Sequence, residues 1–334
     1  MTKIKPSQGA PYARILGVGG YRPTRVVPNE VILEKIDSSD EWIRSRSGIA
    51  TRHWASPEET VTMMSVEASG KALADAGIPA ERIGAVIVST VSHFKQTPAV
   101  ATEIADRVGA IKPAAFDISA GCAGFGYALT LAKGMVVEGS AEYVLVIGVE
   151  RLSDLTDLED RATAFLFGDG AGAVVVGPSD VPAIGPTVWG SEGDKSETIK
   201  QTVPWTEYQG PGDGNKFPAI TQEGQAVFRW AVFEMAKVAQ QALDAAGITA
   251  DDLDVFIPHQ ANMRIIDSMV KTLKLPEHVT VARDVETTGN TSAASIPLAM
   301  ERLLATGAAK SGDTALVIGF GAGLVYAATV VTLP

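Results

Sequence analysis

The chain has 334 residues, of which 46% are hydrophobic and 6% aromatic; it contains 33 glycines and carries a formal net charge of −11. This length corresponds to roughly two domains with a large core, and the composition favours a compact α/β protein over a β-sandwich or a disordered chain. The negative charge argues against broad binding to nucleic acids or anionic membranes, although a local basic patch for an acidic partner is compatible with it.

Three further features narrow the class of protein. No apolar run reaches the roughly 18 residues that a membrane span needs, and the N-terminal segment has no apolar signal-peptide core. A single cysteine excludes an internal disulfide and any multi-cysteine zinc site. We therefore expect a cytoplasmic protein that binds neither nucleic acid nor a membrane.

Glycine-rich runs occur at residues 17–23, 168–174 and 319–325. The first carries Arg22 where a dinucleotide-binding fingerprint needs its third glycine, and the other two lead into apolar strands. We interpret all three as places of close backbone packing and expect no Rossmann nucleotide site.

Two pairs of segments recur at an offset of about 170 residues, which indicates a duplication. Residues 72–89 predict a helix end, a stop at Gly77, an acidic connector and a short apolar strand, and residues 242–259 repeat that order with a stop at Gly247. Residues 121–148 and 289–319 form the second pair. We therefore predict an N-terminal half over 1–178 and a C-terminal half over 179–334, each with a mixed, mostly parallel sheet covered by helices.

The only cysteine lies in a predicted strand-to-helix turn. Residues 114–119 predict a strand, and apolar residues at helical spacing from Phe125 to Val136 predict a helix that ends at Gly139. Cys122 then lies at the helix N-terminus, where backbone N–H groups and the helix dipole favour a thiolate and can hold an oxyanion. The alternative is a buried cysteine that only fills space.

Two stretches in the middle of the chain depart from the repeat. Residues 149–167 form an insertion of the first half. The stretch at about 178–222 is rich in glycine, proline and aspartate, which predicts an irregular loop and a candidate lid.

Two polar residues of the second half complete a candidate site. His259 follows an apolar strand and precedes a helix predicted from Met263, so it lies where open α/β sheets build their sites. By the repeat, Asn290 occupies the turn equivalent to that of Cys122. If the halves pack about a pseudo-twofold axis, the three residues meet at one interface. A hydrogen-bonded core histidine and an ordinary Gly-Asn turn are the alternatives.

These motifs together resemble the β-ketoacyl-acyl carrier protein synthase III family, the FabH-type initiation ketosynthases of the thiolase superfamily. The resemblance runs essentially from end to end and is carried by SSDEWIRSRSGIATRHW (38–54), DISAGCAGF (117–125), DRATAFLFGDGAGA (160–173), PHQANMRII (258–266), GNTSAAS (289–295) and GFGAG (319–323). It implies a duplicated thiolase-like fold with two mixed sheets in an αβαβα arrangement, a homodimer, and no metal or redox cofactor.

The resemblance also implies an acyltransferase that initiates type II fatty acid synthesis. A starter acyl-CoA acylates Cys122, and His259 and Asn290 hydrogen-bond the thioester oxygen of malonyl-acyl carrier protein while decarboxylation generates an enolate. Attack on the acyl-cysteine yields 3-oxoacyl-acyl carrier protein, CO2 and CoA. Backbone N–H groups of Cys122 and Ala322 form the oxyanion hole, and Phe320 shields the site; the family often has glycine where this chain has Ala322.

Further residues are assigned to the substrates by the same resemblance. The residues implied for CoA are Ser38, Trp42, Arg46, Arg161, Gly224, Gln225, Phe228 and Asn262. The residues implied for the acyl carrier protein are Gln260, Ala261, Asn262, Met263, Arg264, Lys271 and Lys274. The spacing of the last three basic residues places them on one face of a helix, where they offer an acidic partner a basic stripe.

The acyl pocket and the pathway leave alternatives open. The resemblance places Thr97 in the acyl pocket across the dimer, and threonine in place of phenylalanine predicts that branched four- to five-carbon starters are accepted. A ketosynthase that primes a polyketide, or a chalcone-synthase-like enzyme that extends from malonyl-CoA, keeps the fold and changes the reaction partner. A scaffold that binds the carrier protein without catalysis is the third alternative.

Overall fold

The computed structural model describes residues 4–210 and 217–334 and contains two five-stranded sheets that share one topology. The first sheet has the order β1 (Tyr12–Tyr21), β7 (Asp169–Ser179), β6 (Tyr143–Arg151), β4 (Ile83–Ser89) and β5 (Ala114–Ile118). The second has the order β8 (Val188–Ser191), β14 (Val325–Thr332), β13 (Thr314–Gly321), β11 (Val255–Pro258) and β12 (Thr280–Val281).

Each sheet is mixed, and four of its five strands run in one direction. In the first sheet β7 is antiparallel to both neighbours, whereas β6, β4 and β5 are parallel. In the second sheet β14 is antiparallel to both neighbours, whereas β13, β11 and β12 are parallel. The prediction of two mixed, mostly parallel sheets is confirmed.

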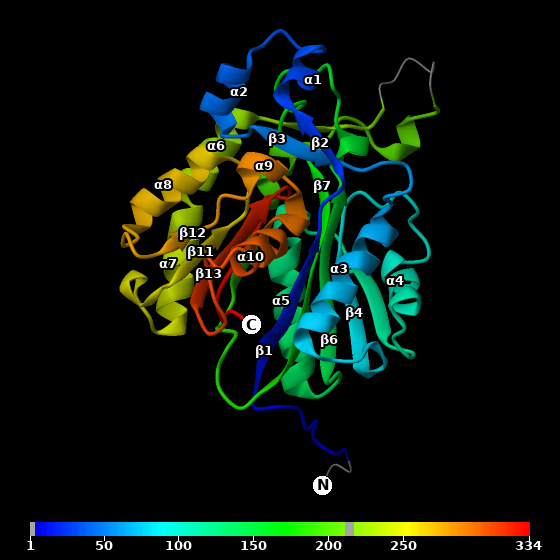
Figure 1. Cartoon of the computed structure of the whole chain (residues 1–334), viewed down its shortest axis with the longest axis vertical. Helices are drawn as coiled ribbons and strands as arrows, with labels where there is room; N and C mark the ends of the chain where they lie inside the picture. The colour runs from blue at the N-terminus through cyan, green and yellow to red at the C-terminus, as the bar shows by residue number, and fades with distance from the viewer. Residues whose placement is uncertain (1–3, 211–216) are drawn as a thin grey trace.

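Helices and sheets alternate in five layers (Figure 1). The helices α3 (Val61–Ala76) and α4 (Val100–Val108) cover the outer face of the first sheet, and α7 (Met235–Ala246) and α8 (Met263–Leu273) cover that of the second. Between the sheets lie α5 (Gly124–Glu138) and α10 (Ser295–Ala305). Because α5 and α10 are buried by sheets on both sides, their inner residues are small or aliphatic, with Phe125 the one buried aromatic of α5.

Smaller elements gather at the end of the molecule where the site lies (Figure 1). They are β2 (Arg25–Pro28), α1 (Asn29–Leu33), α2 (Asp40–Ser47), β3 (Thr51–Trp54), β9 (Ile199–Gln201), β10 (Ile220–Gln222), α6 (Gly224–Phe233) and α9 (Val285–Thr288).

The predicted helix stops agree with the structure. Helices α3, α5 and α7 end at Gly77, Gly139 and Gly247, each in the left-handed backbone region that glycine adopts without steric cost. Helix α8 begins at Met263, as expected.

The repeat aligns one pair of turns in a different register from the predicted one. The short 3-10 turns Gly121–Ala123 and Ser292–Ala294 precede α5 and α10, and Gly121 and Ser292 both have φ of 47°. Cys122 therefore corresponds to Ala293, and Asn290 lies three residues before the cysteine's equivalent position. The two residues share one turn region but not one position, because the sequence alignment of short glycine-rich turns tolerates such a shift.

The stretch at about 178–222 is not a loop throughout, so that prediction is wrong in part. It contains β8, the edge strand of the second sheet, and the ribbon strands β9 and β10. These strands are three or four residues long, and β8 is specified by its pairing with β14 rather than by its own composition. Residues 211–216 of the stretch lie outside the described part of the chain.

Two findings concern the described residues as a whole. Every helix in the described part of the chain is too short or too polar to cross a membrane. Those residues also contain no cluster of three or more His, Cys, Asp or Glu side chains with the geometry to hold a metal ion.

Candidate active site

The carboxyl ends of the parallel strands open onto a cavity of about 710 Å³ between the two halves. The residues of the predicted site line it together: Cys122, His259, Asn290, Phe320 and Ala322. Both halves thus contribute residues to the same cavity, as the duplication predicted.

Cys122 lies in the turn between β5 and α5, with its sulfur close to the second half. A Cβ added at Gly321 would lie 2.8 Å from Cys122 Sγ, so any residue other than glycine at this position would clash with the thiol. The backbone N–H groups of Cys122 and Ala322 both lie at the sulfur, where they lower the pKa of the thiol. Two converging N–H groups are the arrangement that stabilises an oxyanion formed next to the nucleophile.

The thiol is protonated at rest, in contrast to the thiolate that the turn predicted. Burial raises the pKa of Cys122 to about 11, and the hydrogen bond from Ser292 and those from the backbone N–H groups lower it only in part. Desolvation of the charged form outweighs the N-terminal dipole of α5 here. Attack by this thiol therefore needs a proton acceptor.

His259 follows β11, and its ring contacts Ser295, the first residue of α10. Its backbone N–H donates to Ile318 O at 2.7 Å, and its Nδ1 lies 2.7 Å from Ser295 Oγ. Because Ser295 Oγ accepts the N–H of Gln260 at 3.4 Å, its own proton is free for Nδ1, which favours the tautomer with the proton on Nε2. Burial lowers the pKa of His259 to about 3, so the ring is neutral. It therefore acts as a hydrogen-bond donor rather than as a cation.

Asn290 is 7% exposed and is held through its backbone and its side-chain oxygen. Its N–H donates to Leu166 O at 2.9 Å, and its Oδ1 accepts the N–H of Ser292 at 2.8 Å. The Nδ2 end is then the donor end of the amide at the cavity wall. Asn290 and His259 thus both offer a donor to the same cavity.

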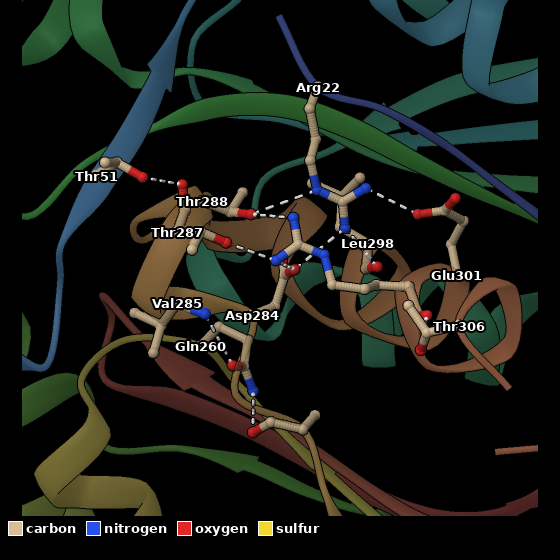
Figure 2. Close-up of polar contacts among 12 residues, drawn as sticks. Arg22, Thr51, Gln260, Asp284, Val285, Thr287, Thr288, Leu298, Glu301 and Thr306 are labelled. Carbon is tan, nitrogen blue, oxygen red and sulfur yellow. Dashed lines mark hydrogen bonds and ion pairs between the residues drawn. The ribbon is translucent and has the colours of Figure 1, made fainter. Parts of the chain in front are cut away.

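A polar network links Gln260, the residue after His259, to α9, which precedes Asn290 in the chain (Figure 2). Gln260 donates to Pro258 O at 2.7 Å and accepts the N–H of Val285, the first residue of α9, at 3.1 Å. Asp284, 4% exposed, binds Arg302 at 2.7 Å and Arg22 at 3.2 Å. Arg22 comes from the first half, so this ion cluster also joins the halves.

Gln260 was predicted to contact the acyl carrier protein, and this prediction is wrong because the residue does not lie on the surface. It is 1% exposed, and both ends of its amide bind the backbone inside the protein. The sequence around Gln260 gives no signal of this burial, since two of its three partners, Ala282 and Val285, lie 22 and 25 residues away in the chain.

The predicted CoA residues of the first half gather on and near α2. Trp42 packs against Arg161, whose guanidinium carbon lies 5.0 Å from the ring centroid, and Arg46 lies 5.9 Å from the same ring. Ser38 lies just before α2. Arg161 and Trp42 touch directly here, so an adenine that stacks between them must displace the guanidinium.

The predicted CoA residues of the second half are less close to the cavity. Gly224, Gln225 and Phe228 lie on α6 and are not among the residues that line it, whereas Val227 and Trp230 of the same helix are. Asn262 caps α8 through the N–H of Arg264 and donates to Arg46 O at 3.0 Å. The sequence placed the right helix, α6, near the cavity but not the face of α6 that lines it, because the packing of α6 decides which residues point inward.

The predicted carrier-protein helix has its basic residues at the surface. Arg264, Lys271 and Lys274 are exposed, and Arg264 covers the ring of Phe228 at 4.9 Å. None of the three has an ion-pair partner among the described residues. Lys274 follows the last helical residue as the C-cap of α8. Ala261 lines the cavity, and Met263 opens α8.

Thr97 is exposed and is not part of the cavity wall of its own chain, although the neighbouring Gln96 is. The structure also brings in residues that the sequence did not single out: Ser292, Ser295 and Glu150. The two serines belong to the GNTSAAS segment, and Glu150 is a charged residue directly after a run of buried strand residues, which is the available signal.

The comparisons with known proteins agree with one another. Residues 116–193 match the family described as 3-oxoacyl-[acyl-carrier-protein (ACP)] synthase III, and residues 243–333 match its C-terminal family. The chain is 88% identical to beta-ketoacyl-[acyl-carrier-protein] synthase III 1 of Streptomyces coelicolor, with 100% of both chains covered.

Two solved structures are similar over nearly the whole chain. A priming beta-ketosynthase of a polyketide biosynthetic pathway has 48% identity and a TM-score of 0.96, with 100% of this chain and 99% of that chain covered. The 3-oxoacyl-[acyl-carrier-protein] synthase III of Aquifex aeolicus has 38% identity and a TM-score of 0.87, with 96% and 99% covered.

Proposed function

The chain belongs to the 3-oxoacyl-[acyl-carrier-protein] synthase III family of condensing acyltransferases, and on that premise we propose that Cys122, His259 and Asn290 carry out the initiating condensation of type II fatty acid synthesis. The observation that carries this proposal is that a thiol, two oxyanion donors and two further donors line one cavity. The substrates are a starter acyl-CoA and malonyl-acyl carrier protein, and the chemistry needs no other cofactor.

In the first half-reaction the sulfur of Cys122 attacks the thioester carbon of the acyl-CoA. The N–H groups of Cys122 and Ala322, which already point at the sulfur, bind the oxygen as it becomes negative. The tetrahedral intermediate collapses, CoA leaves, and the acyl group stays on Cys122.

In the second half-reaction the thioester oxygen of malonyl-acyl carrier protein accepts hydrogen bonds from His259 and Asn290. Loss of CO2 leaves negative charge on that oxygen, and two neutral donors stabilise it. The enolate carbon then attacks the acyl-cysteine. Phe320, packed edge-on at 5.4 Å against the ring of His259, keeps water away from the carbanion.

Binding of CoA is proposed at the α2 end of the cavity. A purine ring stacks well on an indole, and a guanidinium on its other face adds a cation–π contact, which suits Trp42 and Arg161. Ser38 and Arg46 lie beside them for the phosphates. Val227 and Trp230 replace Gly224, Gln225 and Phe228 as the α6 residues nearest the pantetheine arm.

Binding of the acyl carrier protein is proposed at the basic face of α8, formed by Arg264, Lys271 and Lys274. The protein has a net charge of −11, so three exposed cations without carboxylate partners among the described residues are a local exception. An acidic helix docked there brings its prosthetic arm to the cavity mouth, because Asn262 and Ala261 connect α8 to that mouth.

A comparison of malonyl donors tests the function. We expect malonyl-acyl carrier protein to give 3-oxoacyl-acyl carrier protein with release of CO2 and CoA, and free malonyl-CoA to give little product. Lys271→Glu should raise KM for malonyl-acyl carrier protein about fivefold and leave acylation by acyl-CoA unchanged, because a rim charge acts on docking. The matched control is Lys237→Glu, an exposed lysine of α7.

The other outcomes of that experiment identify the alternatives. Efficient use of malonyl-CoA would favour a chalcone-synthase-like enzyme, and no product with either donor would favour a scaffold. Priming of a polyketide uses the same two half-reactions and is a second candidate, since one similar structure is a priming ketosynthase of a polyketide pathway. Product formation with polyketide carrier protein but not with fatty acid carrier protein would select it.

A homodimer in the cytoplasm is proposed as the working form. The strand β5 is an edge of the first sheet and is partly exposed from Ala115 to Ile118, so its free edge offers a pairing site for the same strand of a second copy. Thr97 is exposed next to α4, which packs on β5, and in such a dimer it faces the partner's acyl pocket.

The small side chain at Thr97 leads to a prediction about the starter. We expect isobutyryl-CoA to be turned over within about tenfold of acetyl-CoA, because threonine leaves space for the two extra methyl groups. A pocket that excluded them would discriminate by about 1–3 kcal/mol, or about 10–200-fold, for each. Thr97→Phe should reduce turnover of isobutyryl-CoA and spare that of acetyl-CoA. A wild type that strongly prefers acetyl-CoA would contradict the assignment.

A further inference from the structure

Glu150 is a buried carboxyl group beside the cavity that the two half-reactions leave unused. It is 0% exposed and follows a run of buried residues in β6. A carboxylate in such a place is costly unless hydrogen bonds hold it, and burial raises the pKa of Glu150 to about 7. The group therefore exchanges a proton near neutral pH.

The hydrogen bonds of Glu150 fix its position and point it at the site. Ser92 Oγ donates to it at 2.6 Å, and the N–H of Val91 donates at 3.1 Å. Thr90 Oγ1 adds a longer bond at 3.3 Å. No cation pairs with Glu150 among the described residues, since the adjacent Arg151 binds Asp154 instead. The carboxyl group is thus held by neutral donors, which leaves its charge free to change.

Ser292 connects this carboxyl group to the nucleophile. Its hydroxyl lies beside both groups: it lowers the pKa of the Cys122 thiol and that of the Glu150 carboxyl group, and Ser292 and Cys122 line the same cavity. The residue has φ of 47°, a left-handed conformation that costs a serine roughly 1 kcal/mol, whereas its counterpart in the other half is Gly121. This left-handed backbone places the Ser292 hydroxyl near both the Cys122 thiol and the Glu150 carboxyl group.

We propose that Glu150, acting through Ser292, accepts the proton of the Cys122 thiol when a starter acyl-CoA reacts and returns it after the condensation. This inference rests on the proposed function, because it assumes that Cys122 is the acylated residue. Glu150 touches no substrate, so its role is to hold a proton and to position Ser292.

The proton and electron balance closes over one cycle. The S–H bond of Cys122 breaks, its proton passes to Ser292 Oγ, and the proton of Ser292 passes to the carboxylate of Glu150. The thiolate forms a bond to the acyl carbon, and the bond from that carbon to the CoA sulfur breaks; the CoA thiolate takes a proton from water. After carbon–carbon bond formation, the bond to Cys122 breaks and its thiolate regains the proton through Ser292.

The relay also assists the second half-reaction. While the acyl-enzyme exists, Glu150 is neutral, so it places no negative charge beside the developing enolate. The titratable side chains on the cavity wall are Cys122, the neutral His259, His93, Lys95, Asp117 and Lys200, and an ionised Glu150 raises the pKa of the Cys122 thiol by repulsion. One negative charge is thus shared between Glu150 and Cys122.

The test is the rate of single-turnover acylation by acetyl-CoA as a function of pH, followed by intact mass. Wild type should accelerate as Glu150 ionises through about pH 7 and then level off. Glu150→Gln should acylate about 10–100-fold more slowly at pH 7, with the deficit shrinking as the pH approaches the thiol pKa of about 11. Glu150→Asp should recover part of the rate.

Ser292→Ala gives an independent test that leaves the buried acid in place. It should slow acylation as Glu150→Gln does, and the double variant should be no slower than either single variant, because both remove one relay. Asp169→Asn is the matched control: it neutralises another fully buried carboxyl group, bound to Ser153 and Ala55, and should leave the pH profile unchanged.

Three results would overturn the relay. They are acylation of Glu150→Gln within twofold of wild type at pH 7, a deficit that stays constant across pH, and losses of the two single variants that multiply in the double variant. Failure of the proposed function looks different, since wild type itself would then show no acylation at Cys122.

Discussion

Replacing Cys122 by alanine is expected to abolish the acyl-enzyme. Wild type incubated with acetyl-CoA or isobutyryl-CoA should gain the mass of one acyl group, and Cys122→Ala should gain none. Overall condensation should fall roughly 10⁴-fold or more, because the covalent step has no second nucleophile. The chain contains one cysteine, so no other thiol can substitute for it.

A second measurement separates loss of the nucleophile from loss of the fold. In the proposed mechanism His259 and Asn290 contact the malonyl donor rather than the acyl group, so Cys122→Ala should still release CO2 from malonyl-acyl carrier protein. Equal mass gain in wild type and Cys122→Ala would place the acyl group on another residue and refute the mechanism. A folded variant that lacks both activities would show that the two half-reactions are not separate.

Replacing either donor of the second half-reaction is expected to give the opposite pattern. His259→Ala and Asn290→Ala should each reduce condensation about 10²–10³-fold, the usual effect of removing one oxyanion donor, while acylation of Cys122 stays within a few-fold of wild type. The measurement is a chase: the acyl-enzyme is formed first, and its decay is followed after addition of malonyl-acyl carrier protein.

Asn290→Asp sharpens this result because it keeps the shape of the side chain and exchanges a donor for an acceptor. A carboxylate at that place repels the enolate, so the loss should be at least as large as for Asn290→Ala. His278→Ala, at a histidine bound to Leu253 O outside the cavity, is the matched control and should condense normally. Acylation that falls together with condensation would contradict separate roles.

The low pKa of His259 adds a condition on pH. The ring is neutral above about pH 4, so protonation of this histidine removes no activity between pH 5 and 8. Any acid limb in that range should therefore move to higher pH in Glu150→Gln and stay in place in a variant of His259.

Local features of the sequence predicted much of the fold correctly. Gly77, Gly139 and Gly247 end helices because a left-handed backbone is a local property, and the alternation of strand and helix around Cys122 follows from hydrophobic period. The duplication predicted that both halves contribute to one cavity, and both do. The division of the chain into two halves at residue 178 remains a prediction.

Features that depend on neighbours far away in the chain were decided only by the tertiary structure. The thiol of Cys122 is protonated at rest, because burial between the halves outweighs the local N-terminal dipole that the sequence made visible. Gln260 binds backbone groups inside the protein, although it follows a site histidine in a motif assigned to docking. Desolvation and long-range hydrogen bonds are sums over spatial neighbours, so no local pattern contains them.

The sequence by itself predicted three residues that line the candidate site: the lone cysteine in a small-residue turn, a histidine at a strand end, and an asparagine in the matching turn region. Only the tertiary structure decided the pKa shifts of these groups and of Glu150 beside them. Glu150 meets Ser92 from 58 residues away and Ser292 from the other half of the chain. The identity of reactive groups is written in local sequence, whereas their protonation depends on the burial and partners that folding creates.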